Sequence, residues 1–209
     1  MTHYLYPECE TNRGLLGFFL GDIVQFVNEK IDFYEIDFDY MTHLYKHDNN
    51  VYYHSSYKSK LKPYIGVLLN NNGNKYFVPL TSAKPKHINL KLITKDYLMI
   101  NKLVDVNEQE KKAIYKTNPE DNTTKYRITS MLDLRKMIPV PEDKYKKVEL
   151  ASLDLNYQFL LYEEHRFCIG KQDMIKDYAN KLYEKTKSKG QRISKFHCDY
   201  VLLESIMSL

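Results

Sequence analysis

The chain has 209 residues, of which 43% are hydrophobic, 13% aromatic and 28% charged. This composition is typical of a soluble globular protein and excludes a chain that is disordered throughout. The 31 Lys and Arg residues exceed the 27 Asp and Glu residues by four, a net charge too small to identify a partner by itself.

Cysteine use and hydropathy limit the compartment. Cys9, Cys168 and Cys198 are scattered without the spacing of a disulfide framework or a zinc site. The longest apolar run, residues 15–21, is far shorter than the roughly 20 residues of a membrane span, and the cationic start of a secretory signal is missing. We therefore expect a cytoplasmic protein that does not cross a membrane.

Residues 1–30 are predicted to be a helical N-terminal extension, and residues 31–209 a single domain. Apolar residues recur on one helical face of the extension. They are Leu16, Phe19, Ile23 and Val27. After the extension, apolar residues alternate with acids over residues 31–38, which predicts a strand, and a short helix opens near Asp39.

A β-hairpin is the firmest structural prediction. Strand patterns over residues 63–69 and 75–80 flank Asn72 and Gly73, a dipeptide that favours the tight turn between two antiparallel strands. In such a hairpin the start of the first strand lies beside the end of the second. Lys62 is therefore expected to lie near Thr81 and Ser82.

The rest of the chain alternates between strand and helix patterns. Further strands are predicted from Tyr97, Tyr126 and Lys136, with Pro139 at a sheet edge or strand end. The polar residues 107–125 predict a surface insertion made of a short helix and a loop. Helical patterns follow up to Gly170, up to Gly190 and over residues 199–207, so we expect an α+β domain with a compact, twisted antiparallel sheet and flanking helices.

Charge is unevenly distributed along the chain. Residues 49–95 contain no Asp or Glu, where the average composition predicts roughly six, and they contain eight Lys. The same window holds five Tyr and two His, so that cations stand beside flat aromatic rings. This combination favours binding of a polyanion such as RNA, although a solvated lysine-rich surface would give the same pattern.

Other chemistries have weaker candidates. There is no glycine-rich phosphate loop, which argues against a nucleotide enzyme. His43 and His47 stand four residues apart without a metal-protease motif, so we interpret them as surface histidines. Glu163 and Glu164 are adjacent, and side chains of adjacent helix residues point in different directions, so we interpret the pair as part of a solvated helix face.

A group of hydroxyl and ammonium side chains follows the second hairpin strand. Thr81, Ser82, Lys84 and His87 are close in sequence, and Lys62 is expected beside them. Such groups suit RNA cleavage without a metal, in which the 2′-hydroxyl attacks the adjacent phosphate and the donors stabilise the growing negative charge. An ordinary Lys, with a pKa of about 10.4, is a charge stabiliser at neutral pH and not a base. Lys62 could act as a base only if burial or a neighbouring Lys lowered its pKa, so we expect it to stabilise charge. A hydroxyl-capped turn is the alternative interpretation of Thr81 and Ser82.

At these residues the sequence resembles the ToxN/AbiQ family of endoribonuclease toxins, which act in type III toxin–antitoxin and phage abortive-infection systems. Five segments carry the resemblance, in the order found in the family. They are FYEID at Phe33, KPYIGVLL at Lys62, KYFVPLTSAKPKH at Lys75, MLDLRKMIPVP at Met131 and CDYVLLE at Cys198. The first 30 residues precede the usual start of the family.

The resemblance implies a barrel-like fold related to the MazF and Kid toxins. It also implies cleavage without metal or cofactor at adenine-rich sites, leaving 2′,3′-cyclic phosphate and 5′-hydroxyl ends, with Lys62, Thr81, Ser82 and Lys84 as catalytic residues. The side chains expected to bind RNA are Tyr57, Lys58, Lys60, Tyr64, Lys86, His87 and Lys91. The implied partners are an antitoxin RNA pseudoknot cut from tandem repeats, in a closed protein–RNA assembly, and cellular or phage RNA substrates.

Two other functions remain open at this point. A toxin of the same fold that has no catalytic activity would act on a protein target. A plain RNA-binding module would bind with steep salt dependence and leave the RNA intact.

Overall fold

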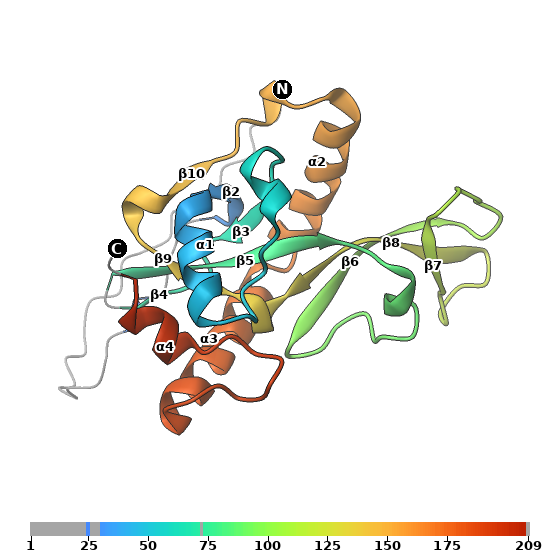
Figure 1. Cartoon of the computed structure of the whole chain (residues 1–209). Helices are drawn as coiled ribbons and strands as arrows, with labels where there is room; N and C mark the ends of the chain where they lie inside the picture. The colour runs from blue at the N-terminus through green and yellow to red at the C-terminus, as the bar shows by residue number, and fades with distance from the viewer. Residues whose placement is uncertain (1–23, 26–29, 72, 208–209) are drawn as a thin grey trace, which may run out of the picture.

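The computed structural model describes residues 24–25, 30–71 and 73–207. It shows a twisted antiparallel sheet with helices packed against it and a long arm of strands that extends to one side (Figure 1). This confirms the predicted α+β fold. The strand pairs among the described residues form no closed ring, so the barrel-like sheet is open in this part of the chain. Within the N-terminal extension, Val24–Gln25 form a strand that pairs with Asn70–Asn71, so the predicted helix is wrong at these two residues. The rest of that predicted helix lies outside the described residues.

Strand β5 is the centre of the sheet. The strands around it are β3 (Tyr64–Gly66), β4 (Asn70–Asn71), β5 itself (Asn74–Ser82), β8 (Thr124–Asp133) and β9 (Ile138–Val140). One edge of β5 pairs with β3 and β4, and the other pairs with β8 and β9. Residues 76–81 of β5 are all buried because both faces of the strand are covered, with Tyr76 packed on Tyr183 and Phe77 on Tyr145.

The predicted hairpin is confirmed. Tyr64 in β3 lies opposite Pro79 in β5, and the backbone amide of Leu80 donates to the carbonyl of Pro63 at 3.0 Å. Gly73 has a φ of 85°, the left-handed conformation that the turn requires, whereas Asn72 is outside the described residues. Pro139 lies in β9, which pairs only with β5 among the described strands, as expected for proline at a sheet edge.

Three short elements complete the sheet at the other side. Strand β2 (Asp32–Ile36) pairs with β3 and with β10 (Tyr145–Lys147), and β1 (Val24–Gln25) pairs with β4. Helix α1 (Phe38–His47) follows β2, as predicted, and the Asp37 carboxylate caps it by accepting from the amide of Tyr40 at 2.8 Å.

The arm on the right of Figure 1 contains β6 (Tyr97–Asp105), β7 (Ile114–Thr117) and the first half of β8. Both β6 and β7 pair with β8, on opposite edges. The predicted short helix and loop for residues 107–125 is therefore wrong. Ile114, Tyr115 and Thr117 are residue types that are common in strands, and pairing with β8 outweighs the polar sequence around them.

Three helices follow, as predicted. They are α2 (Leu155–Ile169), α3 (Gln172–Lys189) and α4 (Tyr200–Ser205). Helix α2 packs on β6, and α4 packs on β9 and α3. The Glu204 carboxylate on α4 accepts from the hydroxyls of Tyr76 on β5 and Tyr183 on α3, at 2.8 and 3.0 Å. These contacts connect the C-terminal helix to the centre of the sheet.

Short 3₁₀ helices link the larger elements. They are η1 (Ser55–Lys58), η2 (Pro85–His87), η3 (Leu134–Lys136), η4 (Glu142–Lys144) and η5 (Leu150–Ser152).

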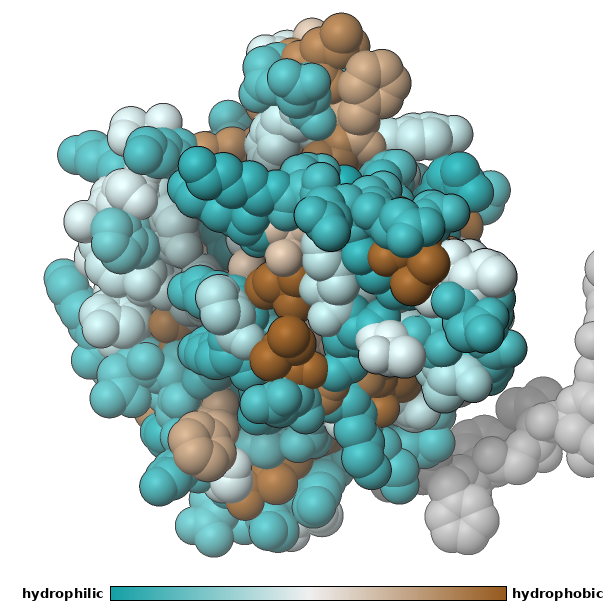
Figure 2. All heavy atoms as spheres, turned by 90° about the vertical axis from the view of Figure 1, so that its right-hand side faces the viewer, coloured by the Kyte–Doolittle hydropathy of each residue, from teal (hydrophilic) through white to brown (hydrophobic). Residues whose placement is uncertain are grey.

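The surface seen from the arm side is mainly hydrophilic, with apolar side chains in small separate groups (Figure 2). Among the described residues, no helix has both the length and the apolar character needed to cross a membrane.

Candidate active site

Lys62 lies directly before β3, and the hairpin holds it against the end of β5. Its ammonium group donates to the carbonyl of Leu80 and lies 4.3 Å from the centre of the Tyr52 ring and 5.8 Å from that of Tyr57. Aromatic faces attract cations, so the two rings and the carbonyl fix the position of the ammonium group. Lys62 therefore lies beside the end of the second hairpin strand, as predicted.

Burial changes the acidity of Lys62. The loss of hydration, together with the charge of Lys84, lowers its pKa from 10.5 to about 8, while Glu164 acts in the opposite direction. At pH 7 about a tenth of the Lys62 side chains are then uncharged. Burial beside another Lys is the condition under which the sequence analysis allows Lys62 to exchange its proton near neutral pH.

A cavity of about 270 Å³ opens at Lys62, and we call it the active cavity. Its walls come from the loop before β3, from the end of β5, from β8 and from α2. The polar residues in these walls are Tyr52, Ser56, Tyr57, Lys60, Lys62, Ser82, Lys84, Ser130, Tyr157 and Glu164. Three of the four predicted catalytic residues, Lys62, Ser82 and Lys84, thus face one cavity.

Glu164 on α2 is a member of the active cavity that the sequence analysis missed. The residue is 1% exposed, and its carboxylate accepts from the hydroxyl of Ser130 on β8. Burial raises its pKa from 4.5 to about 7. The hydroxyls of Ser130 and Thr129 and the charge of Lys62 act in the opposite direction, because they favour the charged form. The predicted solvated pair is correct only for Glu163, which forms an ion pair with Lys102 at 2.8 Å.

A signal for Glu164 exists in the sequence. Tyr157, Leu160 and Leu161 mark the inner face of α2, and Glu164 continues that face at helical spacing. A carboxylate on an apolar face must find a partner or remain protonated when the helix packs. Ser130 could not be identified as that partner, because only the packing of α2 brings it close.

Thr81 lies outside the active cavity. Successive residues of a strand point to opposite faces, so Ser82 faces the cavity and Thr81 faces away from it. The Thr81 hydroxyl is buried and donates to the carbonyl of Met131 on β8 at 3.1 Å. The structure gives Thr81 a contact within the sheet, in place of the predicted contact with substrate.

The predicted RNA-binding residues divide into three groups. Tyr57 and Lys60 line the active cavity, and Lys58 lines a neighbouring one. Tyr64 is 2% exposed, and its hydroxyl donates to the carbonyl of Tyr52 at 3.3 Å, so this side chain does not reach the surface. Burial and the adjacent Tyr52 raise the pKa of Tyr57 above its ordinary value, so its hydroxyl keeps its proton.

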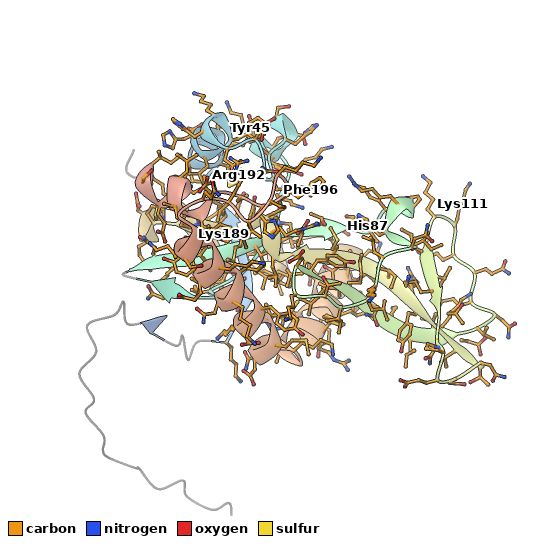
Figure 3. The ribbon with its side chains drawn as sticks, turned by 90° about the horizontal axis from the view of Figure 1, so that it is seen from below. Tyr45, His87, Lys111, Lys189, Arg192 and Phe196 are labelled. Atoms are coloured by element: carbon orange, nitrogen blue, oxygen red, sulfur yellow. The ribbon has the colours of Figure 1, made fainter. Side chains whose placement is uncertain are left out.

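The other three predicted RNA-binding residues lie near η2. His87 is buried, and its Nδ1 accepts from the backbone amide of Lys84 at 3.1 Å, which holds the turn after β5. Burial and the charges of Lys86 and Lys84 lower its pKa. Lys86 and Lys91 are exposed beside it. Figure 3 shows His87 next to the arm that carries Lys111, away from Tyr45 of α1.

Residues 49–95 contain no Asp or Glu, but acidic residues from other parts of the chain lie close to two of their lysines. Lys75 lies 2.6 Å from Glu142, and Lys62 shares the active cavity with Glu164.

Cys168 and Cys198 are buried free thiols. Among the residues that the structure describes, His, Cys, Asp and Glu side chains form no group of three or more that could hold a metal ion.

A protein-family model described as "Toxin ToxN, type III toxin-antitoxin system" matches residues 32–208. The chain belongs to the ToxN family. This confirms the resemblance found in the sequence, and it places both Lys62 and Glu164 inside the matched region.

Two characterised relatives are similar over most of their length. Endoribonuclease ToxN of Bacillus thuringiensis subsp. kurstaki is 28% identical over 181 residues, covering 82% of this chain and 80% of the relative. Endoribonuclease AbiQ of Lactococcus lactis subsp. lactis is 25% identical over 196 residues, covering 92% and 94% respectively.

Solved structures of ToxN-family proteins share the fold. One concerns selective toxin inhibition by a non-coding RNA pseudoknot in type III toxin–antitoxin systems; it is 25% identical, has a TM-score of 0.63, and covers 86% of this chain and 96% of its own. Another is AbiQ, a lactococcal anti-phage endoribonuclease, at 22% identity and a TM-score of 0.64, covering 86% of this chain and 97% of its own. These likenesses confirm the predicted fold family.

Proposed function

We propose that this protein is an endoribonuclease toxin that is inhibited by a structured RNA. One observation carries the proposal beyond family membership. Lys62 and Glu164, with pKa values of about 8 and about 7, face the same cavity as Ser82 and Lys84. Groups that exchange protons near neutral pH are suited to general acid and base catalysis, and the cations and hydroxyl beside them are suited to a phosphate.

In the proposed reaction the ribose 2′-oxygen attacks the adjacent phosphorus. The Glu164 carboxylate accepts the 2′-hydroxyl proton, the new O2′–P bond forms, and the P–O5′ bond breaks. The Lys62 ammonium group supplies the proton that the leaving O5′ oxygen takes up. The products are a 2′,3′-cyclic phosphate and a 5′-hydroxyl, and protons and charge balance without a co-reactant.

Ser82 and Lys84 have a different role in this proposal. The Ser82 hydroxyl and the Lys84 ammonium group stabilise the negative charge that grows on the phosphoryl oxygens. A preorganised donor of this type is typically worth about 10²–10³ in rate. Tyr52 and Tyr57 hold the Lys62 ammonium group at the cavity, so the acid is in position before the substrate binds.

The proposed inhibitor is an antitoxin RNA in a closed protein–RNA assembly, as part of an abortive-infection system. The relatives support this, since one solved structure concerns inhibition by an RNA pseudoknot and another is an anti-phage endoribonuclease. Lys60, Lys62 and Lys84 at the active cavity suit an RNA backbone of either inhibitor or substrate. We place the protein in the cytoplasm, where both RNAs are available, with residues 31–209 as its single toxin domain.

Incubation of the purified protein with adenine-rich single-stranded RNA in EDTA tests this function. We expect cleavage with cyclic phosphate and 5′-hydroxyl ends, and we expect no cleavage where the scissile nucleotide is replaced by its 2′-deoxy analogue. Cleavage of the deoxy-substituted RNA at that position would exclude attack by the 2′-hydroxyl. Tight, salt-dependent binding that leaves all-ribose RNA intact would instead indicate an RNA-binding module.

A further inference from the structure

A second cavity lies next to the active cavity, and we call it the side cavity. Its volume is about 270 Å³, and its walls come from the end of β2, the start of α1, η1, η4 and β10. Tyr57 lines both cavities. A small cleft lined by Phe38, Tyr57 and Lys62 connects the walls of the two, because it shares Phe38 with the side cavity and Lys62 with the active cavity.

The two cavities differ in charge. The active cavity has three ammonium groups and one carboxyl group, and that carboxyl group has a pKa near 7. The side cavity has three cations and three acids: Lys58, Lys144, Lys146, Glu35, Asp37 and Asp143. The active cavity therefore suits a phosphate group, whereas the side cavity suits a polar ligand without net charge.

Aromatic rings form part of the side cavity. The Tyr57 ring lies nearly parallel to that of Tyr52, at an interplanar angle of 15° and a centroid distance of 6.1 Å. Phe38 packs on Tyr53 with centroids 5.7 Å apart. These neighbours hold Tyr57 and Phe38 in place, so both rings are preorganised for a flat ligand. Stacking on an aromatic face is a general way in which proteins hold the bases of single-stranded RNA.

We propose that the side cavity binds the nucleobase of a nucleotide that flanks the scissile linkage. This inference rests on the proposed endoribonuclease function and assigns a second binding site to it. The base lies against Tyr57 and Phe38, and its polar edge bonds to side chains such as Glu35 and Lys144. Carboxylates accept and ammonium groups donate, so the cavity offers partners for both kinds of atom on a base edge. The shared Tyr57 then separates the base from the reacting phosphate.

The test uses short RNAs with one cleavage site, in which single flanking nucleotides are replaced by abasic nucleotides. The backbone and its charge stay the same, so only the base is removed. We expect one flanking replacement to lower kcat/KM of the unmodified protein by about tenfold, the effect of losing one stacked base. In Phe38→Leu and Glu35→Gln, the intact RNA is cleaved more slowly and the same abasic replacement costs only about twofold to threefold.

Glu120→Gln is the matched control for Glu35→Gln, because Glu120 is an exposed residue of the arm. We expect it to keep the tenfold cost of the abasic replacement. If the abasic replacement still lowers kcat/KM by the full tenfold in both folded variants, Phe38→Leu and Glu35→Gln, the side cavity does not bind the base, and the endoribonuclease function stands. If the folded unmodified protein cleaves no intact RNA, the proposed function fails and this inference fails with it.

Discussion

The ammonium group of Lys62 and the carboxyl group of Glu164 face one cavity, and burial brings their pKa values to about 8 and about 7. In water the two groups differ by six units, 10.5 against 4.5, and exchange protons at opposite ends of the pH scale. In this cavity the base and the acid are each available at pH 7 to 8. The pH dependence of cleavage should therefore report the protonation of these two side chains.

We predict a narrow bell-shaped pH profile for kcat/KM. Glu164 must be deprotonated to accept a proton, so the rate rises with pH up to about 7. Lys62 must keep its proton, so the rate falls above about 8. Initial rates across pH 5 to 10 with one RNA substrate measure both limbs, each with a slope near one on a logarithmic scale.

A single variant tests whether Glu164 produces the limb of the pH profile near pH 7. In Glu164→Gln we expect the limb near pH 7 to disappear and the rate to fall by about 10²–10⁴, the usual worth of a general base. Glu163→Gln is the matched control and should keep both limbs, because Glu163 lies on the surface and pairs with Lys102. Retention of the limb near pH 7 in folded Glu164→Gln would remove Glu164 from the base role.

Ser82→Ala is predicted to lower kcat by about 10²–10³ with a smaller change in KM. The hydroxyl is assigned to the charge that develops in the transition state, so its loss affects the rate more than binding. Single-turnover cleavage at saturating protein measures this. Ser188→Ala on α3, which lies far from the active cavity in sequence and is exposed, is the control. A decrease of less than threefold in Ser82→Ala would contradict the assignment.

Thr81→Val is predicted to affect stability and not catalysis. The variant keeps the shape of the side chain but removes the hydroxyl that donates to the buried carbonyl of Met131. The register of β5 and β8 leaves this carbonyl its backbone partner, so the variant loses one hydrogen bond without leaving an unpaired acceptor. Such a bond is worth about 0.5–1.5 kcal/mol, and urea unfolding should show a loss of that size. We expect kcat within about threefold of the unmodified protein. A loss of kcat as large as that in Ser82→Ala would return Thr81 to the active site.

The hairpin could be predicted because its information is local. A turn dipeptide and two flanking apolar runs determine which strand ends meet, and this pattern is enough to place Lys62 beside Ser82. The direction in which Thr81 points depends on a finer detail. Neighbouring residues of β5 point to opposite faces of the sheet, so a shift of one residue decides whether Thr81 or Ser82 faces the cavity.

The contribution of Glu164 could not be predicted in the same way. Its role depends on α2 packing on the strands of the arm, which places it beside Ser130 and Lys62 from distant parts of the sequence. Strand β7 was missed for a related reason. Its four residues are too few to show a period among polar neighbours, and pairing with β8 is what makes them a strand.

Gly66→Ala is predicted to destabilise the hairpin that positions Lys62. A Cβ atom at Gly66 would lie 2.2 Å from Cδ1 of the buried Phe77 ring, so the ring or β3 must move. Overpacking of this kind typically costs about 1–3 kcal/mol. Gly170→Ala is the control, because a Cβ there has its nearest contact at 3.4 Å and the backbone is in the right-handed region. Equal unfolding free energies for the two variants would contradict the close contact.

Glu164→Gln is also predicted to make the protein more stable at alkaline pH while it impairs cleavage. Burial raises the folded-state pKa of Glu164 to about 7, above its value of 4.5, so the folded state favours the protonated carboxyl group. Stability from this group is complete below pH 4.5 and is lost as pH rises through 7, a penalty of about 3 kcal/mol at most. Gln keeps the acceptor for Ser130 without the charge, so urea unfolding should show the gain at pH 8 and none at pH 4.5. The exposed Glu163→Gln should show little difference at either pH. A variant at Glu164 that is less stable than the unmodified protein at pH 8 would mean that the charged carboxylate is stabilised where it lies.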